Sequence, residues 1–218
     1  MPDKNWVILL HGLARSAISM ARIEYRLIKE NYHVINVNYP SRDSNIEQLA
    51  NQAIGDALKQ CGDNPVSFVT HSMGGILVRQ YLSLHPISNL NKVVMLGPPN
   101  EGSEIVDKLA EYPVFQLFNG AAGMQLGTDK SSVPKKLGNA NFELGIIAGT
   151  QSINLLLSTL IPGKNDGKVS VKSTKLSGMK DHIEIKTTHP LMTFNAEVID
   201  QIVHFLANGD FKRVEQLK

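Results

Sequence analysis

The segment T-H-S-M-G-G at residues 70–75 places a serine where it could act as a nucleophile. Ser72 follows the buried apolar run 66–69 and precedes a second apolar run, a pattern typical of a turn between a strand and a helix. Such a turn holds a serine hydroxyl clear of the surface. The backbone N–H of Met73, at the start of the helix, could then stabilise an oxyanion. We therefore predict a nucleophile rather than a serine that only caps a helix.

A nucleophilic serine needs a histidine base, and His189 is the best candidate. His189 lies in T-H-P-L-M, after a predicted strand and before a helix, which is a loop position. His182 opens the strand-like run H-I-E-I-K and is expected either to point out of the strand or to pair locally. His71 is expected to pack, and His11 to hold the loop after the first strand.

The base in turn needs a carboxylate that fixes its tautomer. Asp166 in N-D-G-K-V, which precedes His189 in the chain, is a candidate for this acid, although an aspartate before glycine is also common in turns. Glu101, which follows an earlier strand, is the alternative acid.

Composition and charge limit the class of protein. The chain has 218 residues, 42% hydrophobic and 19% charged, which suits one globular domain over residues 1–218. The formal net charge is +2 without a basic cluster, so no nucleic-acid partner is expected. Cys61 is the single cysteine and the histidines lack ligand spacing, so we expect neither a disulfide nor a metal or other cofactor.

The N-terminus and the apolar stretches of the sequence indicate where in the cell the protein is expected. The N-terminus enters a strand at once and lacks the apolar segment of a signal peptide, which favours a cytoplasmic protein, although a trimmed secreted protein stays open. The most apolar stretch, residues 152–161, is about half the length that crosses a bilayer, so no transmembrane segment is expected. Within it, Leu155 to Ile161 is interpreted as core, with a membrane-contact or acyl-binding wall as the alternative.

Strand-like and helix-like segments alternate along the chain, which predicts a parallel sheet with helices on both faces. The expected strands are 6–10, 33–39, 66–69, 92–96, 144–148 and 182–186. The expected helices are 17–29, a segment capped by Ser44 with Glu47 in a capping box, 74–84 and 196–207. Residues 101–141, less regular and rich in Gly, Ser and Lys, are expected to form a cap-like insertion over the carboxyl edge of the sheet, where such folds bind ligands.

Five segments in register resemble the α/β-hydrolase fold, and in particular small triacylglycerol-lipase-like or inositol-deacylase-like hydrolases. They are L-L-H-G-L at 9–13, T-H-S-M-G-G at 70–75, G-P-P-N-E-G-S at 97–103, N-D-G-K-V at 165–169 and T-H-P-L-M at 188–192. The resemblance implies a three-layer fold with a minimal cap. It also implies a triad of Ser72, Asp166 and His189, and oxyanion N–H groups from Leu13 and Met73. Thr70 departs from the glycine that is usual in this family.

The expected activity is hydrolysis of carboxylic esters (EC 3.1.1-type) by an esterase or lipase that forms an acyl-enzyme on Ser72. The same triad would serve a thioesterase or an acyltransferase, and a non-catalytic binding protein with this fold is the remaining alternative. The expected partner is a small-molecule or lipid ester. The acyl and alcohol parts of that ester and the oligomeric state stay open.

Overall fold

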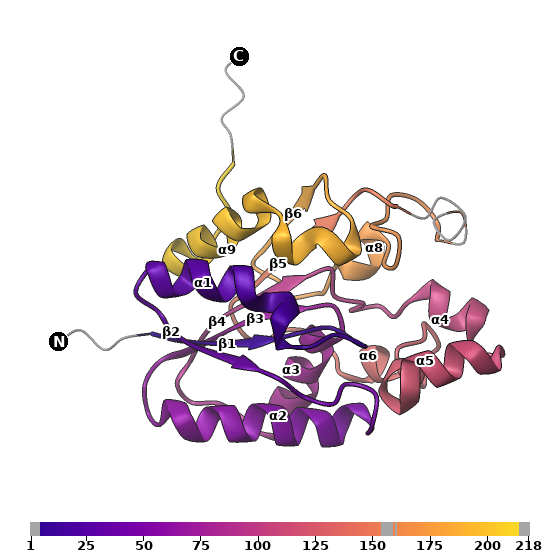
Figure 1. The fold of residues 1–218 in the computed structure, drawn as a ribbon, viewed down its shortest axis with the longest axis horizontal. Coiled ribbons are helices and arrows are strands. Elements are labelled where there is room, and N and C mark those ends of the chain that lie inside the picture. The colour runs from indigo at the N-terminus through magenta and orange to yellow at the C-terminus, as the bar shows by residue number, and fades with distance from the viewer. Residues whose placement is uncertain (1–4, 154–158, 160, 214–218) are drawn as a thin grey trace, which may run out of the picture.

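Six parallel strands form one sheet in the order β2-β1-β3-β4-β5-β6 (Figure 1). The computed structural model describes residues 5–153, 159 and 161–213, and of residues 114–118 it describes the backbone. The strands are β1 (Trp6–Leu10), β2 (His33–Val37), β3 (Val66–His71), β4 (Leu90–Leu96), β5 (Leu144–Gly149) and β6 (Asp181–Ile185). The α/β fold with six strands is thus confirmed, with strand ends that differ from the predictions by a residue or two.

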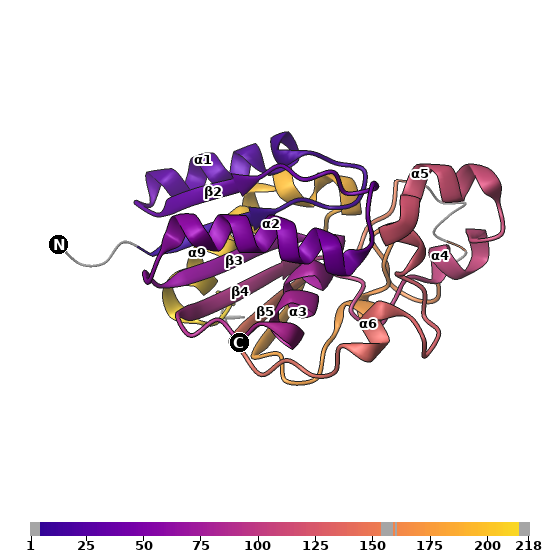
Figure 2. The same ribbon diagram turned by 90° about the horizontal axis from the view of Figure 1, so that it is seen from below.

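Helices cover both faces of this sheet, which makes three layers (Figures 1 and 2). The long ones are α1 (Ala21–Lys29), α2 (Ile46–Cys61), α3 (Met73–Leu84) and α9 (Ala196–Asn208); the one-turn helices are η1 (Ala17–Met20), α8 (Val171–Thr174) and η2 (His189–Phe194). Alternate residues of β1 enter different cores: Ile8 and Leu10 pack towards α2 and α3, whereas Val7 and Leu9 pack towards α1 and α9. Because strands buried on both faces need no polar side, this explains the continuous apolar run in the sequence.

The start of α2 differs from the prediction. Asn45, not Ser44, caps this helix, and its side-chain oxygen accepts the backbone N–H of Gln48 at 2.9 Å. The capping bond spans the expected three residues, but it begins one residue later than the S-x-x-E pattern suggested. Asn and Ser cap helices about equally well, so the sequence alone did not decide between the two neighbours.

The segment between β4 and β5 is more regular than its composition suggested. It contains α4 (Glu104–Leu109), α5 (Pro113–Met124) and α6 (Val133–Lys136). A proline stands in the first turn of both α5 and α6, where its missing N–H costs no hydrogen bond. These three helices gather at one end of the sheet, at the right of Figure 2, beside the carboxyl ends of the strands.

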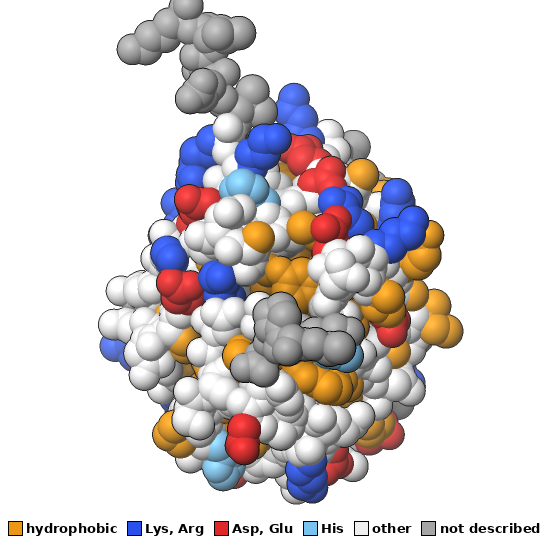
Figure 3. All heavy atoms as spheres, turned by 90° about the vertical axis from the view of Figure 1, so that its left-hand side faces the viewer, with side chains coloured by type: hydrophobic (Ala, Val, Ile, Leu, Met, Phe, Trp, Pro, Cys, Tyr) orange, Lys and Arg blue, Asp and Glu red, His pale blue; other side chains and the backbone are white. Residues whose placement is uncertain are grey.

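The opposite end of the molecule carries the amino ends of the strands. Basic and acidic side chains lie interspersed on this face, without a continuous patch of either sign (Figure 3). None of the helices in the described ranges has the length and apolar character needed to span a membrane.

Candidate active site

Ser72 occupies a sharp turn between β3 and α3. Its backbone has φ 55° and ψ −122°, a conformation that non-glycine residues rarely adopt and that costs about 1–3 kcal/mol. The Ser72 N–H donates to the carbonyl of Leu96 at 2.8 Å, which ties the turn to β4. This is the strand-to-helix turn that the sequence predicted, and it forms with the buried Thr70 two residues before the serine.

The close approach of β1 and α3 explains the glycine two residues after Ser72. A Cβ atom at Gly74 would lie 2.7 Å from the carbonyl oxygen of Leu10 and 3.0 Å from that of His11. Both contacts are to backbone atoms of the neighbouring strand and loop, which cannot rotate away. The small residue is therefore required at position 74.

His189 and Asp166 meet behind the serine turn. Nδ1 of His189 lies 2.7 Å from Oδ2 of Asp166, and both side chains are buried. The backbone N–H of His189 also donates to the carbonyl of Asp166 at 2.9 Å. Because Nδ1 donates to the carboxylate, a neutral His189 presents the lone pair of Nε2.

The Asp166 carboxylate is itself held by its own loop. Its Oδ1 atom accepts the backbone N–H groups of Lys168 at 3.0 Å and Val169 at 2.8 Å. Gly97, at the end of β4, leaves room for the pair, since a Cβ there would lie 3.0 Å from Asp166 Oδ2. Oδ1 of Asp166 thus accepts hydrogen bonds from its own loop, and Oδ2 accepts one from His189.

Glu101, the alternative acid, lies elsewhere. It forms an ion pair with Lys135 at the partly exposed surface of the insertion. The structure therefore brings Asp166, and not Glu101, into contact with His189.

Two other histidines have local partners, as the sequence suggested. His182 Nε2 lies 3.0 Å from Oγ1 of Thr174, whose hydroxyl donates to the carbonyl of Val171. His11 Nε2 accepts the N–H of Tyr39 at 3.3 Å, and its ring stacks on the Tyr39 ring at 4.1 Å. The Tyr39 hydroxyl also donates to the His11 carbonyl. His11 and Tyr39 thus fix the loop that follows β1.

His71 lies against His189. From the sequence, His71 was expected only to pack. Its Nε2–H donates to the backbone carbonyl of His189 at 3.0 Å, and the two rings are 4.8 Å apart. Burial, and then the neighbouring His189, lower the pKa of His71 well below its usual value. His71 is therefore neutral at pH 7 and helps to hold the backbone of the second histidine.

The two backbone N–H groups expected to form an oxyanion hole remain available. Met73 begins α3, where the first N–H groups have no partner within the helix. In the part of the chain that the structure describes, no hydrogen bond uses the N–H of Leu13 or of Met73. Both residues flank Ser72, Leu13 in the loop after β1 and Met73 as the next residue in the chain.

A cavity of about 400 Å³ opens at Ser72 and His189. Its walls come from the loop after β1, the turn after β4, the insertion and the loop after Asp166. They are lined by Gly12, Leu13, Ala14, Arg15, His71, Pro99, Ser103, Ile105, Val106, Leu109, Asn119, Leu126, Lys168 and Val169. Sequence reasoning missed the two cations, Arg15 and Lys168, although each lies two residues after a predicted site residue.

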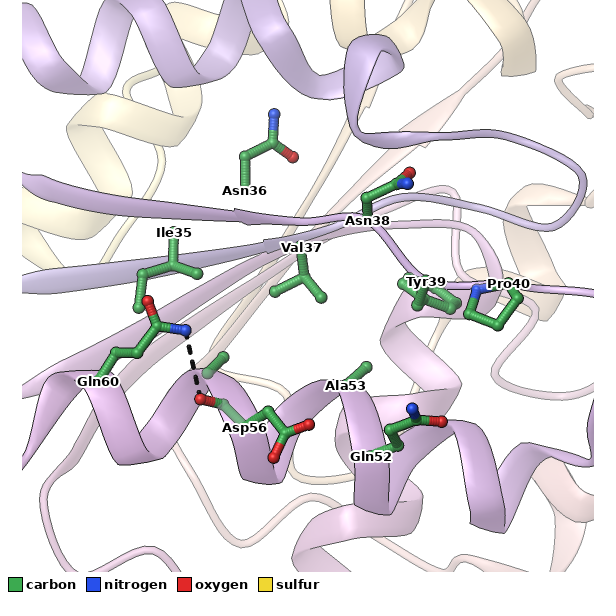
Figure 4. A pocket seen from close by; sticks show the side chains of 11 residues that line it. Ile35, Asn36, Val37, Asn38, Tyr39, Pro40, Gln52, Ala53, Asp56 and Gln60 are labelled. Atoms are coloured by element: carbon green, nitrogen blue, oxygen red, sulfur yellow. Dashed lines mark hydrogen bonds between the residues drawn. The ribbon is translucent and has the colours of Figure 1, made fainter.

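A second hollow of similar volume lies between the edge strand β2 and α2 (Figure 4). Amide and aliphatic side chains line it, together with Asp56, whose backbone carbonyl accepts from Gln60. It contains no serine, cysteine or histidine, so we assign the chemistry to the cavity at Ser72. Among the described residues, no group of three or more His, Cys, Asp or Glu could hold a metal ion.

Some sequence-based interpretations concern residues that are not described. The apolar stretch 152–161 falls largely outside the described residues, which here are 152, 153, 159 and 161, with Ile153 exposed and Ile161 buried. Of the aromatic residues in the insertion, Tyr112 is exposed, and the side chains of Phe115 and Phe118 lie outside the described part.

Comparison with solved structures identifies the architecture. Neither a protein-family model nor a curated protein matches the sequence. The mature lipase BlEst2 from Bacillus licheniformis matches with a TM-score of 0.73 at 20% identity, over 94% of this chain and 93% of that one. The chain has an α/β-hydrolase fold.

Two further structures share the α/β-hydrolase fold at lower similarity. The esterase RhEst1 from Rhodococcus sp. ECU1013 has a TM-score of 0.63 at 15% identity, over 94% of this chain and 91% of that one. Phospholipase PlaB from Legionella pneumophila has a TM-score of 0.62 at 19% identity, over 79% of this chain and 46% of that one. At these identities the likeness concerns the fold, and the chemistry has to be argued from the site.

Proposed function

We propose that the protein is a serine hydrolase that cleaves carboxylic esters through an acyl-enzyme on Ser72. One observation carries the proposal: a strained serine turn shares a cavity with a histidine whose Nδ1 lies 2.7 Å from a buried carboxylate. Backbone strain persists only where surrounding structure maintains it, and such strain is concentrated at functional sites.

The first half of the reaction would acylate the serine. Oγ of Ser72 attacks the ester carbonyl carbon while Nε2 of His189 takes the hydroxyl proton. The N–H groups of Leu13 and Met73 stabilise the tetrahedral oxyanion, and Asp166 stabilises the imidazolium. The intermediate then expels the alkoxide, which takes the proton from His189 and leaves as the alcohol.

The second half would release the acid. Water attacks the acyl carbon as His189 takes one of its protons, and the second tetrahedral intermediate collapses to regenerate the Ser72 hydroxyl. None of these steps calls for a metal ion or an organic cofactor.

The names of the structural neighbours agree with this chemistry. BlEst2 is described as a lipase, RhEst1 as an esterase and PlaB as a phospholipase. Each description belongs to that protein. What we extend to this chain from these names is the cleavage of an ester, and the site at Ser72 favours a carboxylic ester.

The proposal is tested by labelling and turnover together. A fluorophosphonate probe should label the wild-type protein, and Ser72→Ala should lose both labelling and ester turnover, by about 10⁴-fold or more in kcat. Ser83→Ala is the matched control, because Ser83 is exposed on the same helix and bonds only to the carbonyl of Gln80. Near-normal turnover by Ser72→Ala would refute the assignment. A wild-type protein that neither reacts with the probe nor cleaves any ester would be a non-catalytic binding protein.

A further inference from the structure

The charged groups that line the cavity at Ser72 are of one sign. Arg15 and Lys168 contribute to its walls, and among the described residues no aspartate or glutamate does. The Asp166 carboxylate is buried behind His189 and is already engaged by three donors. The space in front of the serine is therefore electropositive.

Both cations stand on backbone that is fixed to the proposed catalytic residues. Arg15 follows Ala14, which has a positive φ of 54° and donates its N–H to Oγ of Ser41 at 3.0 Å. Lys168 donates its own backbone N–H to Oδ1 of Asp166. The two side chains thus start from positions that are set by the oxyanion loop and by the acid loop.

Within the described ranges, the side chains of Arg15 and Lys168 form no ion pair and no hydrogen bond. Lys168 keeps contact with solvent but stands in a concave mouth. Desolvation there, and then the positive charge of Arg15, lower its pKa. Two like charges that repel each other in this way would be stabilised by an anion between them.

The rest of the cavity is suited to hydrocarbon. Its other walls are largely aliphatic, with Leu13, Ile105, Val106, Leu109, Leu126 and Val169. A ligand that satisfies both parts of the cavity has an apolar chain and an anionic group within a few bonds of its ester.

We propose that Arg15 and Lys168 form an anion-binding subsite that selects esters with a carboxylate or phosphate group near the scissile bond. This inference rests on the proposed ester hydrolysis at Ser72 and narrows its substrate class.

The first test compares two soluble esters of one size and one leaving group. These are monoethyl succinate, with a free carboxylate, and ethyl succinamate, in which a neutral amide of equal size replaces the carboxylate. The wild-type kcat/KM should favour the anionic ester by about ten-fold, the size of one charge-assisted contact. That preference should fall as the ionic strength rises, because salt screens partly exposed charges.

Paired variants assign the preference to the two cations. Arg15→Gln with Lys168→Gln should remove most of it. Arg42→Gln with Lys172→Gln changes the net charge equally at exposed residues that do not line the cavity, and should keep it. Equal preference in the two double variants would overturn the proposal, as would a wild type that shows no preference for the anionic member in either this ester pair or the lipid pair described next.

A lipid arm distinguishes the source of the anion. Dispersed dihexanoyl phosphatidylglycerol, which has a net negative charge, is compared with zwitterionic dihexanoyl phosphatidylcholine in the same proteins. A preference that depends on Arg15 and Lys168 in either arm supports the subsite. The arm in which it occurs tells whether the anion is a carboxylate of a soluble ester or a lipid phosphate.

Binding without turnover separates this inference from the proposed function. Calorimetric titration of Ser72→Ala with the same two esters should show tighter binding of the anionic ester, by a similar factor. If the wild type cleaves neither ester but this difference persists, the proposed hydrolysis fails and the anion subsite stands. If both esters are cleaved without any difference in binding or kcat/KM, and the lipid pair shows no difference either, the subsite fails and the hydrolysis stands.

Discussion

The two oxygens of Asp166 have different partners. Oδ1 accepts two backbone N–H groups of its own loop and Oδ2 faces Nδ1 of His189. This division means that a carboxylate and an amide, although equal in shape, are not equivalent at position 166.

Asp166→Asn should therefore lower kcat by about 10⁴-fold on a 4-nitrophenyl ester. The amide oxygen would stay with the Lys168 and Val169 N–H groups, so its NH₂ would face His189 Nδ1. His189 would then carry its proton on Nε2 and could not act as a base. Glu101→Gln, which removes only a surface ion pair, is the control and should change kcat less than two- to three-fold. The reverse ranking would move the acid to Glu101.

These residues could be predicted because the chemistry constrains their types and their order in the chain. The contact between His71 and the carbonyl of His189 could not be predicted from the sequence. These two residues lie 118 positions apart, and His71 is the residue before the nucleophile. Neighbours in a turn are expected to point apart, and only the tertiary structure shows what each one meets. The same holds for the buried Arg79, whose guanidinium donates to the carbonyls of Asn100, Pro134 and Gly138.

Acid should destabilise the protein through its buried neutral histidines. The pKa values of His71, His11 and His182 are lowered, in each case mainly by burial. An unfolded chain binds protons on these rings near the usual pKa of about 6.5, whereas the folded chain does not. Their stabilising contribution is therefore complete above about pH 6.5 and is lost progressively as the pH falls below it.

The measurement is urea unfolding between pH 7.5 and 5. The free energy of unfolding should decrease as the pH falls below about 6.5. His71→Asn, which keeps a donor towards the His189 carbonyl but does not titrate, should show a shallower decrease, although the variant is less stable at pH 7.5. A slope equal to that of the wild type would mean that His71 is not held neutral in the folded protein.

At the scale of elements, the site depends on how closely α3 approaches β1.

The strands and long helices could be predicted from periodicity, because each apolar run or stripe reflects burial in one of the two cores. The exact ends and caps of these elements could not be predicted. At the start of α2, for example, two adjacent polar residues are nearly equally suited to cap the helix, and Asn45 does so. The helices of the insertion were missed because its glycines and lysines hide short apolar stripes such as Ile105 and Val106.

Gly74→Ala should push the start of α3 away from β1. Its methyl group would meet backbone carbonyls of β1 and the following loop, and we expect a loss of about 1–3 kcal/mol in unfolding free energy and a large fall in kcat. Gly55→Ala is the matched control: it lies within α2 with nothing near its added Cβ, and should stabilise the protein by about 0.5–1 kcal/mol. Thermal and urea unfolding check both values. Tolerance of alanine at position 74 would contradict the close packing.

At the scale of the whole molecule, the strands bring residues from distant parts of the chain to one edge of the sheet. Ser72, Asp166 and His189 follow different strands, and the cavity in front of them is roofed by α4 and the residues around it. The parallel topology was predictable from the alternation of strands and helices. The size and charge of the cavity were not predictable, since they depend on how the insertion packs over the carboxyl ends of the strands.

The cavity size predicts a limited acyl chain. A volume of about 400 Å³ is at the lower end for binding sites of small molecules, and each buried methylene contributes about 0.8 kcal/mol until the space is filled. In a series of 4-nitrophenyl esters, kcat/KM should rise and then reach its maximum at short or medium acyl groups. A continued rise through long chains, with a jump above the solubility limit of the ester, would instead indicate a lipase.

The acyl-enzyme itself gives the most direct test of the central claim. The protein is mixed with excess 4-nitrophenyl acetate and quenched in acid, and the intact mass and the peptide that contains Ser72 are measured. We predict a burst of 4-nitrophenol and a mass gain of one acetyl group on Ser72, absent from Ser72→Ala. Release of 4-nitrophenol with the acetyl group on another residue, or at the same rate from Ser72→Ala, would contradict the account.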